Sequence, residues 1–187
     1  IGLATTGGHV AATALLIIDV QQALCFGEVP AYAVKDVIAN LNAVAARVRA
    51  AKQLVVLIQH ESATGVLARD TAGWQFAEGL DVQPADFVVA KRATDSFHQT
   101  ELLELLQQHG VKQLIIGGLQ SEFCVDTTTR RALALGFPLQ LIADGHTTVD
   151  NSVLSAAQIR RHHNETLANI GSFGPRARAV LAAEISI

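Results

Sequence analysis

Short, almost unbroken apolar runs alternate with longer amphipathic stretches along most of this chain. Apolar runs of this length are typical of strands that are buried on both faces of a parallel sheet. The pattern predicts five such strands, at 14–18, 54–58, 87–90, 113–116 and 137–143. Apolar residues at helical spacing predict helices between them, at 33–52, 100–109, from about Cys124 to Gly136, and from a capping box at Ser155 to about Gly171. Residues 172–187 fit either a sixth strand or a terminal helix.

The alternation of strands and helices predicts one α/β domain. Right-handed crossovers between parallel strands place helices on both faces of the sheet. We therefore expect a single three-layer α/β/α domain with a Rossmann-like sheet over residues 14–187, preceded by a tail of residues 1–13. The length of 187 residues suffices for one domain with a full core. Ligands of such sheets bind at the carboxyl ends of the strands.

Composition and charge narrow the range of partners. Half of the residues are hydrophobic, 17% are charged, and the net charge is −3, without a basic block for nucleic acid or anionic lipid. The two cysteines do not make a disulfide framework, and no apolar run approaches the ~20 residues that cross a bilayer. Residues 1–13 lack the basic and apolar regions of a signal peptide. We expect a cytoplasmic protein with a small-molecule substrate and no nucleic-acid or membrane partner.

Three chemically distinct side chains stand at or just beyond the carboxyl ends of three predicted strands. They are Asp19, Lys91 and Cys124. Each alone has a plain structural explanation, as a turn former, a solvated strand end and a small buried thiol. Together they supply an acid–base carboxylate, a cation and a nucleophile. A thiol at a helix N-terminus also meets unpaired N–H groups and the positive end of the dipole, which favour the thiolate.

The segments ALLIIDVQ, VVAKRATDSF, GGLQSEFCVDTTTRRALALGF and ADGHTTVD resemble the isochorismatase-like cysteine hydrolases. That superfamily includes nicotinamidases, N-carbamoylsarcosine amidohydrolases, ureido and biuret hydrolases, and streptothricin hydrolases. The resemblance implies a six-stranded parallel sheet and a catalytic triad of Asp19, Lys91 and Cys124. It also implies a cis peptide between Leu119 and Gln120, and an oxyanion hole made by the backbone amides of Gln120 and Cys124. We further expect a homodimer or homotetramer.

The implied reaction is hydrolysis of a C–N bond in a small amide, carbamoyl, ureido or lactam substrate. Asp19 accepts the proton of the Cys124 thiol, the thiolate attacks the carbonyl, and an acyl-thioester forms. The cysteine favours this chemistry over vinyl-ether hydrolysis, because isochorismate-cleaving members often lack it. An ether hydrolase, a catalytically idle binding protein and a thiol sensor remain alternatives.

The place of the nicotinamidase metal motif, Asp-x-His after the second strand, is taken by Gln59-His60-Glu61. Two adjacent side chains make a poor metal site without further ligands, so we expect no metal and no cofactor. The candidates for substrate contact are Trp74, in the polar segment 62–83, His60, and His146, which follows the fifth predicted strand. Cys25 is expected to be a structural thiol. The sequence does not identify the substrate.

Overall fold

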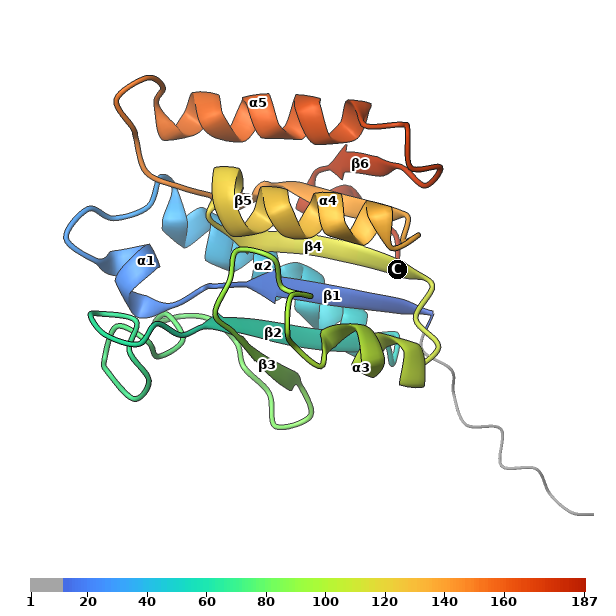
Figure 1. The fold of residues 1–187 in the computed structure, drawn as a ribbon, viewed down its shortest axis with the longest axis horizontal. Coiled ribbons are helices and arrows are strands. Elements are labelled where there is room, and N and C mark those ends of the chain that lie inside the picture. The colour runs from blue at the N-terminus through green and yellow to red at the C-terminus, as the bar shows by residue number, and fades with distance from the viewer. Residues whose placement is uncertain (1–11) are drawn as a thin grey trace, which may run out of the picture.

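The structure is a computed structural model that describes residues 12–187. Most of the predicted tail, residues 1–11, therefore lies outside the described residues. Six parallel strands form one sheet in the order β3-β2-β1-β4-β5-β6 (Figure 1). They are β1 (Thr13–Ile18), β2 (Leu54–His60), β3 (Phe87–Lys91), β4 (Gln113–Leu119), β5 (Leu139–Thr147) and β6 (Ala177–Val180). The six-stranded parallel sheet is confirmed, and the ambiguous segment 172–187 supplies its last strand.

Helices cover both faces of this sheet, as the strand–helix alternation predicts. They are α1 (Gln22–Phe26), α2 (Val34–Ala50), α3 (Leu102–Gln108), α4 (Asp126–Ala134) and α5 (Ala156–Asn169). Helix α2 packs on one face, while α3, α4 and α5 pack on the other (Figure 1). The capping box at the start of α5 is present, with Ser155 and Gln158 bonding each other's backbone. Of these five helices, the five-residue α1 has no counterpart in the predicted pattern.

The central strand β1 shows why its sequence is apolar without alternation. Ala14, Leu16 and Ile18 belong to the core under α3, α4 and α5, while Leu15 and Ile17 belong to the core under α2. Every residue of β1 is buried. From Ala14 to Ile18 both faces of the strand are thus removed from water, and a polar side chain there would lose its hydration.

The carboxyl end of β4 is brought unusually close to β1 by Gly118. Its φ is +122°, and a Cβ atom placed there would lie 2.0 Å from the carbonyl oxygen of Ile18. Gly118 pairs with Ile18 of β1 on one side and with His146 of β5 on the other. A residue with a side chain would force these strands apart, so this glycine sets the spacing of the sheet edge.

Two strands differ from the predicted pattern in ways that bear on the site. β5 runs four residues beyond its predicted end at Ala143, past an irregularity in its pairing with β4, and includes His146. β3 is an edge strand whose first residues, Phe87 and Val88, are exposed, although Lys91 at its end is buried. Among the described residues, no helix has the length and apolar composition that crossing a bilayer requires.

Candidate active site

The fold brings Asp19, Lys91 and Cys124 together at the carboxyl edge of the sheet. Asp19 directly follows β1, Lys91 ends β3, and Cys124 lies in a π-helical turn after β4, Ser121–Val125, here called the cysteine turn. Asp19 and Lys91 are each 1% exposed and Cys124 is 8% exposed. Asp19 has a left-handed backbone with φ of +52°, and its N–H donates to the carbonyl of Ile58 at 2.9 Å. Aspartate tolerates this conformation better than most residues.

The ammonium group of Lys91 lies at the centre of this arrangement. Its Nζ is 2.9 Å from Asp19 Oδ2 and donates to Cys124 Sγ at 3.2 Å. The same nitrogen is 3.1 Å from His60 Nδ1 and donates to the carbonyl of Ala93 at 2.9 Å. Three ammonium hydrogens therefore face four acceptors. The other carboxylate oxygen, Asp19 Oδ1, is buried and has no hydrogen-bond partner.

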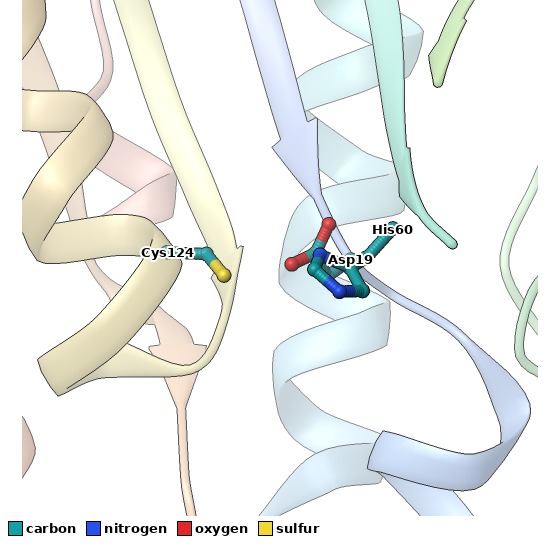
Figure 2. Close-up of side chains that lie close together, drawn as sticks. All are labelled: Asp19, His60 and Cys124. Carbon is teal, nitrogen blue, oxygen red and sulfur yellow. The ribbon is translucent and has the colours of Figure 1, made fainter. Parts of the chain in front are cut away.

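His60 joins this group, here called the Cys124 cluster: Asp19, His60, Lys91 and Cys124. Figure 2 shows His60 beside Asp19, with the sulfur of Cys124 pointing toward them from the cysteine turn. Because His60 Nδ1 faces an ammonium, it must accept, which places the ring hydrogen on Nε2. Burial and the charge of Lys91 lower the pKa of His60, so the ring is neutral.

The position of His60 is fixed through its backbone. The side chain of Gln21 donates to the His60 carbonyl at 2.9 Å and accepts from the His60 N–H at 2.9 Å. His60 is also the residue of β2 that pairs with Lys91 of β3. The sequence pattern gave His60 only a pocket or structural role, because its contact with Lys91 depends on the register between these two strands.

The thiol is protonated in this environment, so the expectation that the helix N-terminus favours a thiolate is wrong for the free protein. Burial and, after it, the carboxylate of Asp19 raise the pKa of Cys124 to about 12, although Lys91 acts in the opposite direction. The cysteine also stands in the π-helical turn, before α4 begins at Asp126. Burial likewise raises the pKa of Asp19, against the opposing charge of Lys91. A raised pKa makes this carboxylate a better proton acceptor.

His146 is not available for substrate contact, contrary to expectation. It is fully buried, and both ring nitrogens are occupied: Ser121 Oγ lies 2.7 Å from Nδ1, and Asn164 Oδ1 lies 2.8 Å from Nε2. Since the Asn164 amide nitrogen donates to the Ala143 carbonyl at 2.9 Å, its oxygen must accept from His146. Ser121 then donates to His146 Nδ1. This His146 chain (Ser121, His146 and Asn164) anchors the first residue of the cysteine turn.

The remaining predicted features are placed as follows. The peptide between Leu119 and Gln120 is cis, immediately before the cysteine turn. The Trp74 carbonyl accepts from the side chains of Gln21 and Gln59, and its indole Nε1 is buried without a hydrogen-bond partner. A substrate contact by Trp74 therefore stays a prediction.

Asp19, His60 and Cys124 are also the side chains here that could hold a metal ion. One ligand atom from each lies within 4.8 Å of the others. Among the described residues, Glu61 does not belong to this group, and its Oε1 accepts from Arg92 at 2.7 Å. The ammonium of Lys91 contacts all three candidate ligands.

The chain is similar to several known proteins. The Isochorismatase domain model matches residues 13–170. A streptothricin hydrolase of Streptomyces noursei is 35% identical over 175 residues, which cover 89% of this chain but only 63% of that protein. A crystal structure of an isochorismatase family protein has a TM-score of 0.83 at 34% identity, covering 91% of this chain and 99% of that one. N-carbamoylsarcosine amidase from Thermoplasma acidophilum shares the fold, with a TM-score of 0.77 at 18% identity over 94% of this chain and 99% of that one.

Proposed function

Since this chain belongs to the isochorismatase family of hydrolases, we propose that it is a cysteine hydrolase acting on a C–N bond. The substrate is a small amide, carbamoyl, ureido or lactam compound, and the intermediate is an acyl-thioester. One observation carries this proposal: the buried ammonium of Lys91 contacts both a carboxylate oxygen of Asp19, at 2.9 Å, and the sulfur of Cys124, at 3.2 Å. The similarity to a streptothricin hydrolase supports a hydrolytic reaction.

The nucleophile forms only when the substrate is in place. With a pKa of about 12, the Cys124 thiol keeps its proton in the free protein. Asp19 Oδ1 is buried and unpartnered, so it is free to accept that proton. Lys91 contacts both Asp19 Oδ2 and the sulfur. The negative charge therefore passes from carboxylate to sulfur while it stays beside the same cation, which keeps the electrostatic cost of the transfer small.

The thiolate then attacks the substrate carbonyl carbon, and the carbonyl oxygen takes the negative charge. The backbone amides of Gln120 and Cys124 donate to that oxygen in this proposal. Collapse of the intermediate breaks the C–N bond, and Asp19 returns its proton to the departing nitrogen. Asp19 next takes a proton from water, the hydroxide attacks the thioester, and the C–S bond breaks. The acid leaves and Cys124 regains a proton.

The alternatives explain less of the geometry. Vinyl-ether hydrolysis needs no thiol, so it leaves the contact between Lys91 and Cys124 without a purpose. A thiol sensor needs an accessible sulfur with a lowered pKa. Here the pKa of Cys124 is about 12 and its exposure is 8%, while Cys25 is fully buried with a pKa also near 12. The cluster therefore fits general-base catalysis better than oxidation sensing.

The proposal is tested by a panel of amides, carbamoyl compounds, ureido compounds and lactams, scored by ammonia or amine release. Reactions of the best substrate are quenched in acid and examined by mass spectrometry. We expect an acyl group on the peptide that contains Cys124 and none on the peptide that contains Cys25. Release of amine without any adduct on Cys124 under single-turnover conditions would argue against the acyl-thioester.

A further inference from the structure

We propose that Asp19, His60 and Cys124 form a transition-metal site that the ammonium of Lys91 keeps closed. A divalent ion such as Zn²⁺ or Co²⁺ competes with this ammonium for the same three atoms and binds once the ammonium is removed. Metal has no part in the proposed hydrolysis, so this inference stands or falls separately from it.

The three side chains have the donor atoms that zinc takes in proteins. A thiolate sulfur, an imidazole nitrogen and a carboxylate oxygen are its usual ligands, with bonds of about 2.0–2.3 Å. Tetrahedral bonds of that length separate ligand atoms by roughly 3.3–3.8 Å. The ligand atoms here already lie within 4.8 Å of one another. They come from the end of β1, the end of β2 and the cysteine turn, and Figure 2 shows them converging. A contraction of about 1 Å would complete the coordination.

The ammonium of Lys91 occupies the position that such an ion would need. Its nitrogen is 2.9 Å from Asp19 Oδ2, 3.1 Å from His60 Nδ1 and 3.2 Å from Cys124 Sγ. A fourth acceptor, the carbonyl of Ala93, lies 2.9 Å away. One buried cation thus contacts a donor atom of each of the three candidate ligands, and a metal ion could not be held there beside it. Lys91 is 1% exposed, so its ammonium is held inside the cluster and does not extend into solvent.

A second feature of the cluster is a carboxylate oxygen that the ammonium does not reach. Asp19 Oδ1 is buried without a hydrogen-bond partner, although buried carboxylate oxygens are normally partnered. The imidazole of His60 already presents its Nδ1 lone pair inward, as a metal ligand does. Gln21 holds the His60 backbone from both sides, so this ligand needs no new support. The site is therefore organised, and only its occupant differs from a metal.

This assignment gives Lys91 a second task beside its electrostatic one. A buried thiol next to an imidazole and a carboxylate would otherwise bind thiophilic ions, and a bound ion would block the sulfur. The ammonium of Lys91 places a positive charge beside Asp19 and Cys124, but unlike a metal ion it forms no coordinate bond with the sulfur. It keeps the nucleophile free.

The test compares Lys91→Met with its parent, both carrying Cys25→Ala so that Cys124 is the single thiol. Co²⁺ is titrated without substrate, and the thiolate-to-cobalt charge-transfer absorption is recorded. We expect one Co²⁺ per chain in Lys91→Met and at least about tenfold weaker binding in the parent. Adding His60→Gln to Lys91→Met should weaken binding by at least about tenfold, because even the loss of an outer partner of a ligand costs that much. Adding His162→Gln and His163→Gln, at two adjacent histidines of α5 outside the Cys124 cluster, should leave Co²⁺ binding unchanged.

Equal Co²⁺ affinity in parent and Lys91→Met would overturn the proposal, as would a folded Lys91→Met that shows no charge-transfer band. Because loss of one partner of a buried ion pair can unfold a protein, a second measurement uses the parent alone. Iodoacetamide labelling of Cys124 is followed with and without equimolar Zn²⁺. We expect the same labelling rate in both. Protection of Cys124 by equimolar Zn²⁺ would show that Lys91 does not exclude the metal.

Discussion

Two groups of buried and half-buried side chains, each containing a histidine, lie at the carboxyl edge of the sheet, near the two strands that pair with Gly118. The Cys124 cluster contains charged groups, an ammonium with more acceptors than hydrogens, and a buried carboxylate oxygen without a partner. The His146 chain is neutral, and both ring nitrogens of its histidine are hydrogen-bonded. Burial lowers the pKa of both histidines, and that of His146 reaches about 4.

The difference indicates a structural role for the His146 chain and a chemical role for the Cys124 cluster. A completed hydrogen-bond chain has one stable arrangement and holds the cysteine turn to β5 and α5. The Cys124 cluster has an acceptor to spare beside a protonated thiol, so a proton can move within it without breaking the fold. Burial alone therefore does not mark a functional histidine. An incomplete set of partners around charged groups is the more informative feature.

The largest expected difference is in kcat, between variants of the Cys124 cluster and variants of the His146 chain. Cys124→Ala should lower kcat for the substrate found in the panel by at least about 10³-fold, because it removes the attacking atom. Cys25→Ala, the matched control at a fully buried thiol, should leave kcat largely intact. Ser121→Ala detaches the His146 chain from the cysteine turn without removing a reacting group, so its loss should be far smaller. Equal rates for the two cysteine variants would remove Cys124 as the nucleophile.

Both groups should be disturbed together by a change at Gly118. Gly118→Ala would place a Cβ atom 2.0 Å from the carbonyl oxygen of Ile18, at a φ of +122°. We expect the free energy of unfolding to fall by about 3 kcal/mol or more, measured by urea denaturation. Gly136→Ala is the matched control: its φ is +98°, but nothing lies within 4 Å of the added atom, so about 1 kcal/mol is expected. Similar losses at the two glycines would show that the close approach of β4 to β1 is unimportant.

A smaller effect, confined to the His146 chain, is expected on acidification. The folded-state pKa of His146 is about 4, against an ordinary value of 6.5, so between these pH values the unfolded protein binds a proton that the folded protein does not. Stability should therefore decrease as pH falls through this window, by up to roughly 3 kcal/mol, and this contribution should level off below about pH 4. His146→Gln cannot titrate. Its urea-unfolding free energy should depend less on pH over the same window, and parallel pH profiles for the two proteins would contradict this assignment.

Much of the fold follows from hydrophobic pattern, because strands buried on both faces leave unbroken apolar runs. Five strands and four helices were predictable in this way. The last strand, Ala177–Val180, is short and contains Arg178, so periodicity could not decide it. Helix α1 has five residues, too few for a helical repeat to emerge. The same strand ends located Asp19, Lys91 and Cys124, because parallel strands bring their carboxyl ends to one edge.

The rest of the site depends on quantities that a linear pattern does not contain. The contact between His60 and Lys91 requires the register of β2 against β3. His146 was misplaced because Asp144 and Gly145 resemble a strand end, whereas β5 continues through them. The state of the thiol could not be predicted from the turn alone, because burial and Asp19 outweigh Lys91.

The central claim is that Asp19 and Lys91 set the proton affinity of Cys124 in opposite directions. The direct measurement is the pH profile of iodoacetamide labelling of Cys124 in a Cys25→Ala background, followed by mass spectrometry. Asp19→Asn removes a charge that raises the thiol pKa, so labelling should shift to lower pH, and each pKa unit changes the thiolate fraction about tenfold. Lys91→Met removes a charge that lowers the thiol pKa, so labelling should shift to higher pH. Profiles that coincide with the parent in both folded variants would contradict the account.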